Sequence, residues 1–188
     1  QTGVTEMVRK RLGWLVLLFL GQMFTVTAMA SYEETLAAAT VLALFIPMII
    51  SSGGNSGSQA ATLIIRALST DDIKFDQWKH VLKRELMSGL MLGIMLGVMG
   101  TIVISTWMLV RGEPFTSAVW LQALTVGTSL VGVVLFGNLS GSILPFIMSK
   151  LGLDPAVTSA PFISTLVDVT GIIIYFTVAV LLLRGVVL

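Results

Sequence analysis

Residues 47–59 read Pro-Met-Ile-Ile-Ser-Ser-Gly-Gly-Asn-Ser-Gly-Ser-Gln, which places glycines, hydroxyls and two carboxamides inside a stretch that is otherwise hydrophobic enough to lie in a bilayer. A hydrocarbon core holds no water to satisfy exposed polar groups. Small polar residues therefore persist at membrane depth only where protein covers them or where they line a wet path. The stretch predicts a permeation or substrate pathway.

The chain around this stretch has the composition of a membrane protein. It contains 188 residues, of which 55% are hydrophobic and only 11% are charged, and its mean hydropathy is +0.96. These values exclude a soluble domain of this length. Five segments are long enough to span a core that needs about 20 apolar residues per helix: residues 12–30, 36–68, 86–110, 118–148 and 156–183. We expect an all-α membrane protein in which residues 12–188 form a five-helix transmembrane domain and residues 1–11 a cytoplasmic connector tail.

The distribution of charge predicts the orientation of these helices. Nine of the 11 Lys and Arg residues precede the first span or lie between the second and third or the fourth and fifth spans. Because such residues are retained on the cytoplasmic side of short loops, we expect the N-terminus in the cytoplasm and the C-terminus outside, in a multi-pass protein of the cell (inner) membrane. The net charge of +1 argues against a nucleic-acid partner, and the absence of cysteine excludes disulfides and thiolate metal sites.

Asp168 lies near the middle of the fifth span, in the run Thr-Leu-Val-Asp-Val-Thr-Gly at residues 165–171. A carboxylate at a helix centre costs about 2.5–3.5 kcal/mol on the insertion scale, and no positive side chain lies within one helical turn of it. Helical spacing puts Ser164, Pro161 and Gly171 on the same face. We interpret Asp168 as a cation ligand. The alternative is a hydrogen bond to a hydroxyl or carboxamide of a neighbouring helix.

A second polar face lies on the second span, where Ser51, Asn55, Gln59 and Thr62 follow one another at four, four and three residues. The alternative for Asn55 and Gln59 is a hydrogen bond between helices, worth about 0.6 kcal/mol each. One carboxylate with carboxamides, hydroxyls and carbonyls makes an all-oxygen site, which suits Mg²⁺, Ca²⁺ or Mn²⁺ rather than Zn²⁺ or Cu²⁺. Mg²⁺ dehydrates reluctantly and is held through retained waters by one or two carboxylates. One Asp168 from each subunit of a homodimer would therefore suffice.

Three further patterns predict packing or symmetry. Glycines recur every four residues from Gly89 to Gly97, which favours close helix contact, and Asp154 followed by proline is typical of a helix start. The run Gly-Asn-Ser-Gly-Ser at residues 54–58 is echoed by Gly-Asn-Leu-Ser-Gly-Ser at residues 137–142. This echo is either a parallel repeat near a binding site or a chance similarity.

These residues resemble the MgtE family of magnesium channels, which is related to the animal solute-carrier magnesium transporters. The resemblance covers essentially all 188 residues, as the five-helix transmembrane domain. Its most specific parts are Pro47 with Gly-Gly-Asn-Ser-Gly-Ser-Gln-Ala-Ala-Thr at residues 53–62, Ile-Arg-Ala-Leu at residues 65–68, Asp-Pro-Ala at residues 154–156, Pro161 with Phe162, and the Asp168 run with Tyr175.

The resemblance implies a homodimer in the lipid bilayer with a pore on its two-fold axis, lined by the second and fifth helices, in which Asp168 and Ser164 hold hydrated Mg²⁺. Mn²⁺, Co²⁺ and Ca²⁺ are further candidate ions. It also implies cytoplasmic regulatory domains of the CBS type, outside this sequence. Ala160 stands where some relatives carry asparagine. The expected pore-lining residues are Gly54, Asn55, Gly57, Gln59, Ala160, Pro161, Thr165 and Gly171.

The sequence therefore predicts a passive divalent-cation (Mg²⁺) channel rather than an enzyme. A proton- or Na⁺-coupled secondary cation carrier that uses Asp168 is the alternative. An intramembrane enzyme is disfavoured because only one carboxylate lies at membrane depth, where an aspartyl dyad needs two, and no histidine cluster is available for a metalloprotease.

Overall fold

The computed structural model describes residues 3–114 and 116–186, apart from the side chains of residues 10, 157 and 158, and these residues fold into helices and short connections. Five of the described helices are long and apolar enough to cross a membrane, which confirms the predicted all-α class and the number of spans. In chain order the elements are α1 (Val4–Ala30), α2 (Glu33–Ala38), the 3₁₀ helix η1 (Thr40–Phe45), α3 (Ile46–Ser69), the 3₁₀ helix η2 (Phe75–Gln77), α4 (Trp78–Val110), α5 (Ser117–Lys150) and α6 (Pro155–Leu183).

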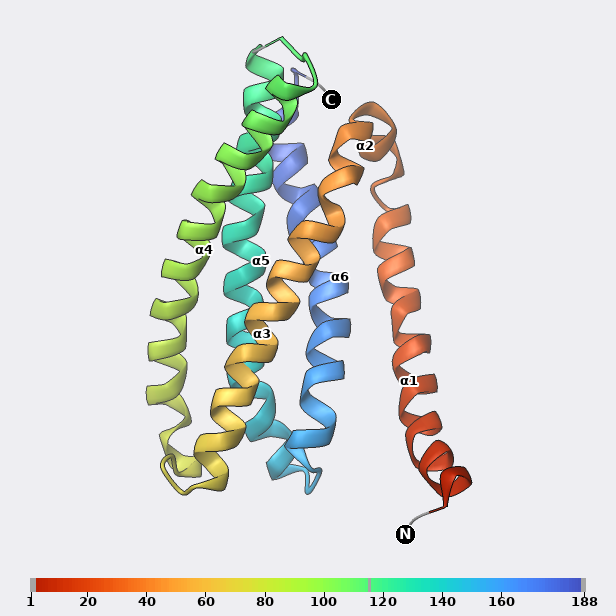
Figure 1. Cartoon of the computed structure of the whole chain (residues 1–188), viewed down its shortest axis with the longest axis vertical. Coiled ribbons are helices and arrows are strands. Elements are labelled where there is room, and N and C mark those ends of the chain that lie inside the picture. The colour runs from red at the N-terminus through yellow and green to blue at the C-terminus, as the bar shows by residue number, and fades with distance from the viewer. Residues whose placement is uncertain (1–2, 115, 187–188) are drawn as a thin grey trace.

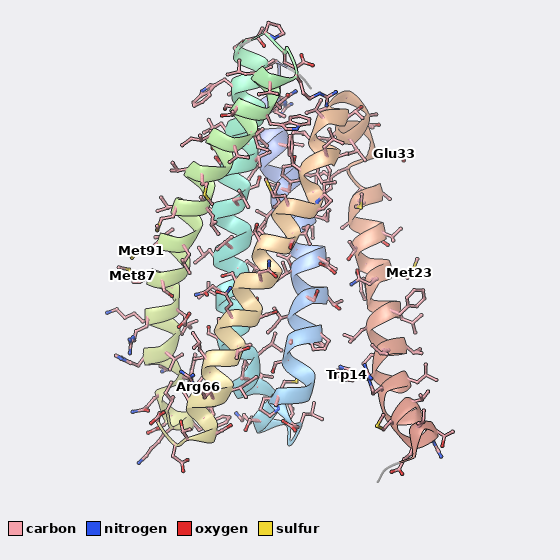
Figure 2. All side chains as sticks on the ribbon, viewed as in Figure 1. Trp14, Met23, Glu33, Arg66, Met87 and Met91 are labelled. Atoms are coloured by element: carbon pink, nitrogen blue, oxygen red, sulfur yellow. The ribbon has the colours of Figure 1, made fainter. Side chains whose placement is uncertain are left out.

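The long helices lie side by side, and their connections gather at two opposite ends of the bundle (Figure 1). The start of α1 shares one end with the α3–α4 and α5–α6 connections, while α2 and the α4–α5 connection lie at the other end. Arg66 and Glu33 accordingly occupy opposite ends (Figure 2). The basic connections therefore lie together at the end where the chain begins, as the charge distribution predicted.

The helix bounds differ from the predicted spans at three places. Helix α1 begins at Val4 and α4 at Trp78, so both include polar turns before their apolar cores. Neither polar turn contains glycine or proline, and residues with fair helix propensity continue a helix whether or not they are apolar. Residues 1 and 2 of the expected connector tail lie outside the described residues. The predicted second span begins instead as α2 and η1, and α3 has Pro47 in its first turn, where proline is tolerated.

Helix α5 lies at the centre of the bundle and packs against α3, α4 and α6. Glycines of α4 allow the close approach: a β-carbon at Gly93 would lie 2.9 Å from the carbonyl oxygen of Val131, and one at Gly97 would lie 2.6 Å from that of Gly127. The spaced glycines of α4 are thus packing residues, as predicted.

The two echoing glycine motifs pack against each other. Gly53 of α3 meets Gly137 of α5, and one turn later Gly57 meets Gly141, at the same sequence separation in both pairs. A constant separation means that α3 and α5 run in the same direction, as Figure 1 also shows. This backbone contact places one face of α3 against α5, and the opposite face of α3 does not contact α5.

Helix α6 begins as the sequence predicted, because the Asp154 side chain accepts a hydrogen bond from the Ala156 amide at 2.9 Å and Pro155 takes the first helical position. The helix continues through Pro161. Helix α1 packs mainly on α6: the Trp14 ring stacks on Phe162, with centroids 6.5 Å apart. Met23 of α1 points away from the bundle, as do Met87 and Met91 of α4 (Figure 2).

Candidate functional site

Asp168 is half-buried in the middle of α6, and its Oδ2 accepts a hydrogen bond from Nε2 of Gln22 at 2.8 Å. The Oγ1 of Thr25 in turn donates to Oε1 of Gln22 at 3.1 Å. This arrangement matches the alternative interpretation, a hydrogen bond to the carboxamide of a neighbouring helix. The role of Asp168 in cation binding stays a prediction. Neither Gln22 nor Thr25 was singled out from the sequence, although Gln22 is the one carboxamide in the first apolar segment.

Asp168 faces a cavity of about 360 Å³ between α1, α3 and α6. Its wall is mainly apolar and includes Met29, Pro47 and Ile172, and each helix adds one or two polar residues. We call it the Asp168 cavity. The polar lining residues are Gln22, Thr25, Ser51 and Asp168.

The predicted polar face of α3 is exposed along its whole length. Ser51, Asn55, Gln59 and Thr62 are all exposed in the chain, and Nδ2 of Asn55 donates to Oγ of Ser51 at 3.4 Å within the same helix. A groove of about 540 Å³ runs along Asn55, Ser58, Gln59, Thr62 and Leu63. Because Ser51 lines the Asp168 cavity and its neighbour Asn55 lines the groove, the two hollows follow one another along α3.

Helix α6 presents Ala160, Ser164 and Asp168 at successive four-residue intervals, so they share one face. Ala160 and Ser164 are exposed and Asp168 is half-buried. Pro161 and Thr165 are also half-buried, and Oγ1 of Thr165 donates to the Pro161 carbonyl oxygen at 3.2 Å. The α6 face that carries Asp168 therefore continues from the Asp168 cavity, through Ser164 and Ala160, toward the start of the helix.

The predicted glycines of the pathway fall into two groups. Gly54 is half-buried, and beyond its own helix backbone a β-carbon there would meet no atom of the described residues within 4 Å. Gly57 and Gly171 are instead buried in helix contacts, where a β-carbon would lie 2.6 Å from Cγ2 of Ile163 and 2.5 Å from Cδ1 of Ile50, respectively. Both glycines serve close helix packing in the folded chain, and their place in a pathway stays a prediction.

Asn138, the counterpart of Asn55 in the echoing motif, has a different environment. It is 4% exposed, and its Nδ2 donates to Oε2 of Glu85 at 2.7 Å and to the Glu85 carbonyl oxygen at 2.8 Å. Its Oδ1 accepts from Oγ of Ser56 at 3.4 Å. Asn138 therefore ties α3, α4 and α5 together, and the two asparagines of the echo do not share a role.

The donor set at Asp168 suits a hydrated ion better than a bare one. Among the described residues, no group of three or more His, Cys, Asp or Glu side chains lies together as a metal-binding cluster. A single carboxylate with amides and hydroxyls around it cannot replace the whole inner shell of a divalent cation, but it can accept hydrogen bonds from waters that the cation retains.

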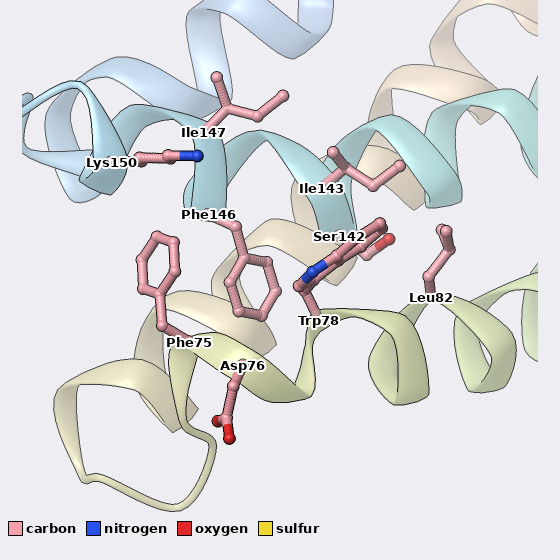
Figure 3. A pocket seen from close by; sticks show the side chains of 9 residues that line it. All are labelled: Phe75, Asp76, Trp78, Leu82, Ser142, Ile143, Phe146, Ile147 and Lys150. Atoms are coloured by element: carbon pink, nitrogen blue, oxygen red, sulfur yellow. The ribbon is translucent and has the colours of Figure 1, made fainter.

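A larger cavity, of about 600 Å³, lies between the start of α4 and the end of α5. Phe75, Trp78, Phe146 and Ile147 give it a mainly apolar wall, with Asp76 and Lys150 among its few polar residues (Figure 3). None of the residues that line the Asp168 cavity or the α3 groove lines this one. Its carboxylate, Asp76, is exposed and shares the wall with the cationic Lys150, so this cavity is a poorer candidate cation site than the one at Asp168.

Comparisons with known proteins point to one family. The sequence model of the MgtE family, described as "Divalent cation transporter", matches residues 46–178. The Magnesium transporter MgtE of Thermus thermophilus is 41% identical over 186 residues, which cover 99% of this chain and 39% of the relative. The protein of the same name from Enterococcus faecalis is 36% identical over 180 residues, which cover 93% of this chain and 37% of the relative. The Bacillus subtilis protein of the same name is 31% identical over 170 residues, which cover 90% of this chain and 36% of the relative.

The chain spans less than two fifths of the length of these curated relatives. The matched part includes α3, where the exposed polar face lies, and most of α6, which carries Asp168. It begins after Gln22, so the partner of Asp168 lies outside the part of the chain that the family model covers.

Proposed function

The chain belongs to the MgtE family of divalent cation transporters, and from that premise we propose that it forms the transmembrane pathway of a Mg²⁺ channel. The cation moves down its gradient in hydrated form, without coupling to protons or Na⁺. Asp168 supplies the negative charge that selects and holds it, and the hydroxyl of Ser164, one turn away, contacts its hydration shell.

The exposed polar face of α3 is the observation that carries this proposal. Ser51, Asn55, Gln59 and Thr62 are exposed on a helix that is long and apolar enough to span a membrane. Polar side chains that face lipid leave their hydrogen-bonding groups without partners, so such a face needs water or another protein surface. A second copy of the chain, related by a two-fold axis, would cover α3 and α6 and enclose a wet path between them.

In this dimer the pore is lined by α3 and α6 of both subunits, with one Asp168 from each side. Two carboxylates match the charge of one divalent cation, and retained waters bridge the distance that a bare ion could not. This chemistry favours Mg²⁺ and also admits Mn²⁺, Co²⁺ and Ca²⁺, because all four accept oxygen ligands.

We propose that the basic end of the bundle faces the cytoplasm, in the cell (inner) membrane, since Lys and Arg in short loops are retained there. The start of α1 then lies on the cytoplasmic side, where regulatory domains of the CBS type would act on the channel. Such domains are partners that the family resemblance implies, and gating by them is part of the proposal.

Uptake of Mg²⁺ into proteoliposomes, without a proton or Na⁺ gradient, tests the function. We would compare the chain with Asp168→Ala at matched reconstitution, and use Asp76→Asn as the control, because Asp76 is an exposed carboxylate in η2 at the basic end. We expect uptake in the unmodified chain and in Asp76→Asn, and loss of uptake in Asp168→Ala. Uptake that survives Asp168→Ala contradicts the proposed site. Uptake that requires an ion gradient favours a coupled carrier instead.

A further inference from the structure

We infer that Gln22 positions the Asp168 carboxylate, so that α1 forms one wall of the cation site. The inference rests on the proposed function, and the hydrogen bond of 2.8 Å from Nε2 of Gln22 to Oδ2 of Asp168 carries it. The two residues are 146 positions apart in the sequence. Both line the Asp168 cavity, together with Thr25 of α1 and Ser51 of α3.

Contacts on both sides of Gln22 hold α1 in place against α6. Next to it, Gly21 lies close to Thr165: a β-carbon at Gly21 would be 3.2 Å from Cγ2 of Thr165. Toward one end of α1 the Trp14 ring stacks on Phe162. Beyond the other end, the hydroxyls of Tyr32 and Thr177 lie 3.2 Å apart. Because these contacts hold α1 against α6 on both sides of Gln22, the Gln22 side chain lies beside Asp168.

The Gln22 amide has a hydrogen-bond partner at each end. Its Oε1 accepts from Oγ1 of Thr25 at 3.1 Å, which leaves the Nε2 group to face the carboxylate. A flipped amide would point its oxygen at the negative charge of Asp168 and lose the bond. Thr25 therefore acts on Asp168 through Gln22.

This bond leaves the carboxylate able to receive a cation. A carboxylate has two oxygens and about four sites that accept hydrogen bonds, and Gln22 uses one of them on Oδ2. Oδ1 accepts no hydrogen bond from the described residues, so it is available for a water of the hydrated ion. Gln22 is neutral, so it orients the carboxylate without cancelling the charge on which cation binding depends. An arginine or lysine in the same place would cancel that charge.

The test compares Gln22→Met, Thr25→Val and the control Thr27→Val. Met keeps a long, flexible side chain but has no donor. Thr27 is exposed on the same helix, and its hydroxyl bonds only to the Met23 carbonyl oxygen, at 2.9 Å, among the described residues. The readout is the Mg²⁺ concentration that gives half-maximal uptake, measured separately from the maximal uptake per folded dimer.

We expect Gln22→Met to raise the half-saturating Mg²⁺ concentration about tenfold, the order expected for loss of one hydrogen bond to a charged group. Maximal uptake should change much less. Thr25→Val should shift the half-saturating concentration in the same direction by a smaller factor, and Thr27→Val should not shift it. An unchanged or lowered half-saturating concentration in Gln22→Met overturns the inference. If Gln22→Met does not fold, an unchanged half-saturating concentration in Thr25→Val overturns it.

A binding measurement keeps this inference separate from the channel proposal. Mg²⁺ that binds the folded state raises the thermal unfolding midpoint in detergent, whether or not the protein conducts. We expect Gln22→Met to need about tenfold more Mg²⁺ than the unmodified chain for the same rise. If Asp168→Ala abolishes uptake while Gln22→Met matches the unmodified chain in both measurements, the channel proposal stands and the role of Gln22 fails. If Mg²⁺ raises no midpoint at all, the role of Gln22 also fails.

Discussion

The backbones of Gly57 in α3 and Gly141 in α5 touch: a β-carbon at Gly141 would fall on the carbonyl oxygen of Gly57. The pair Gly53 and Gly137 repeats this contact one turn earlier. Because the contact buries one side of α3 against α5, Asn55 and its polar neighbours are left on the exposed side. Helix packing thus determines which face of α3 is available to line a pathway.

Replacing Gly141 with alanine should destabilise the bundle, because the added methyl group must push α3 and α5 apart. Overpacking of this kind costs about 1–3 kcal/mol. The thermal unfolding midpoint in detergent should fall clearly in Gly141→Ala. The matched control is Gly54→Ala, since a β-carbon at Gly54 meets no atom of the other described helices within 4 Å. Equal midpoints for the two variants would contradict this packing.

The two asparagines of the echoing motifs should respond in opposite ways to alanine substitution. Asn138→Ala removes a donor to Glu85 and the acceptor of the Ser56 hydroxyl, and an unsatisfied buried polar group costs about 1–3 kcal/mol. Its thermal midpoint should therefore fall. Asn55→Ala removes an exposed side chain whose hydrogen bond to the described residues lies within its own helix, so its midpoint should stay unchanged while Mg²⁺ uptake drops. A fall in the midpoint of Asn55→Ala alone would reverse the two roles.

Tyr175→Phe should destabilise the chain without altering ion selectivity. The Tyr175 hydroxyl is buried and donates to the Leu42 carbonyl oxygen at 2.9 Å, which ties α6 to η1. Loss of that donor leaves the carbonyl without this partner, at a cost of about 1–3 kcal/mol. The measurement is the thermal midpoint together with the ratio of Mg²⁺ to Ca²⁺ uptake. A changed ratio would mean that Tyr175 affects the pathway itself.

Ala160→Asn should lower the half-saturating Mg²⁺ concentration. Ala160 is exposed on the α6 face that carries Ser164 and Asp168, so a carboxamide there can hydrogen-bond to the hydration shell of the ion. One net hydrogen bond of about 0.5–1.5 kcal/mol corresponds to a change of roughly two- to tenfold. Ala160→Val has similar bulk without the polar group and should give no such decrease. A decrease in both variants would mean that size, not hydrogen bonding, matters at this position.

Much of the fold could be predicted from the sequence, because each prediction depended on one helix at a time. Hydropathy located the five spans, although the polar turns that begin α1 and α4 lay outside them. The four-residue spacing of the glycines in α4 predicted a packing face, and Asp154 with Pro155 predicted the start of α6. These features follow from helix periodicity and from capping, which nearby residues determine.

The site was predictable only in part. Hydropathy and helical periodicity alone predicted that Asp168 lies within an apolar span and that Ser51, Asn55, Gln59 and Thr62 share one helical face. Three features depend on how the helices pack: Gln22 bonds Asp168 from 146 residues away, Gly57 and Gly171 are buried, and Asn138 is buried while Asn55 is exposed. The reason is physical. The helical period fixes which residues share a face, but which faces meet depends on how closely the backbones of different helices can approach.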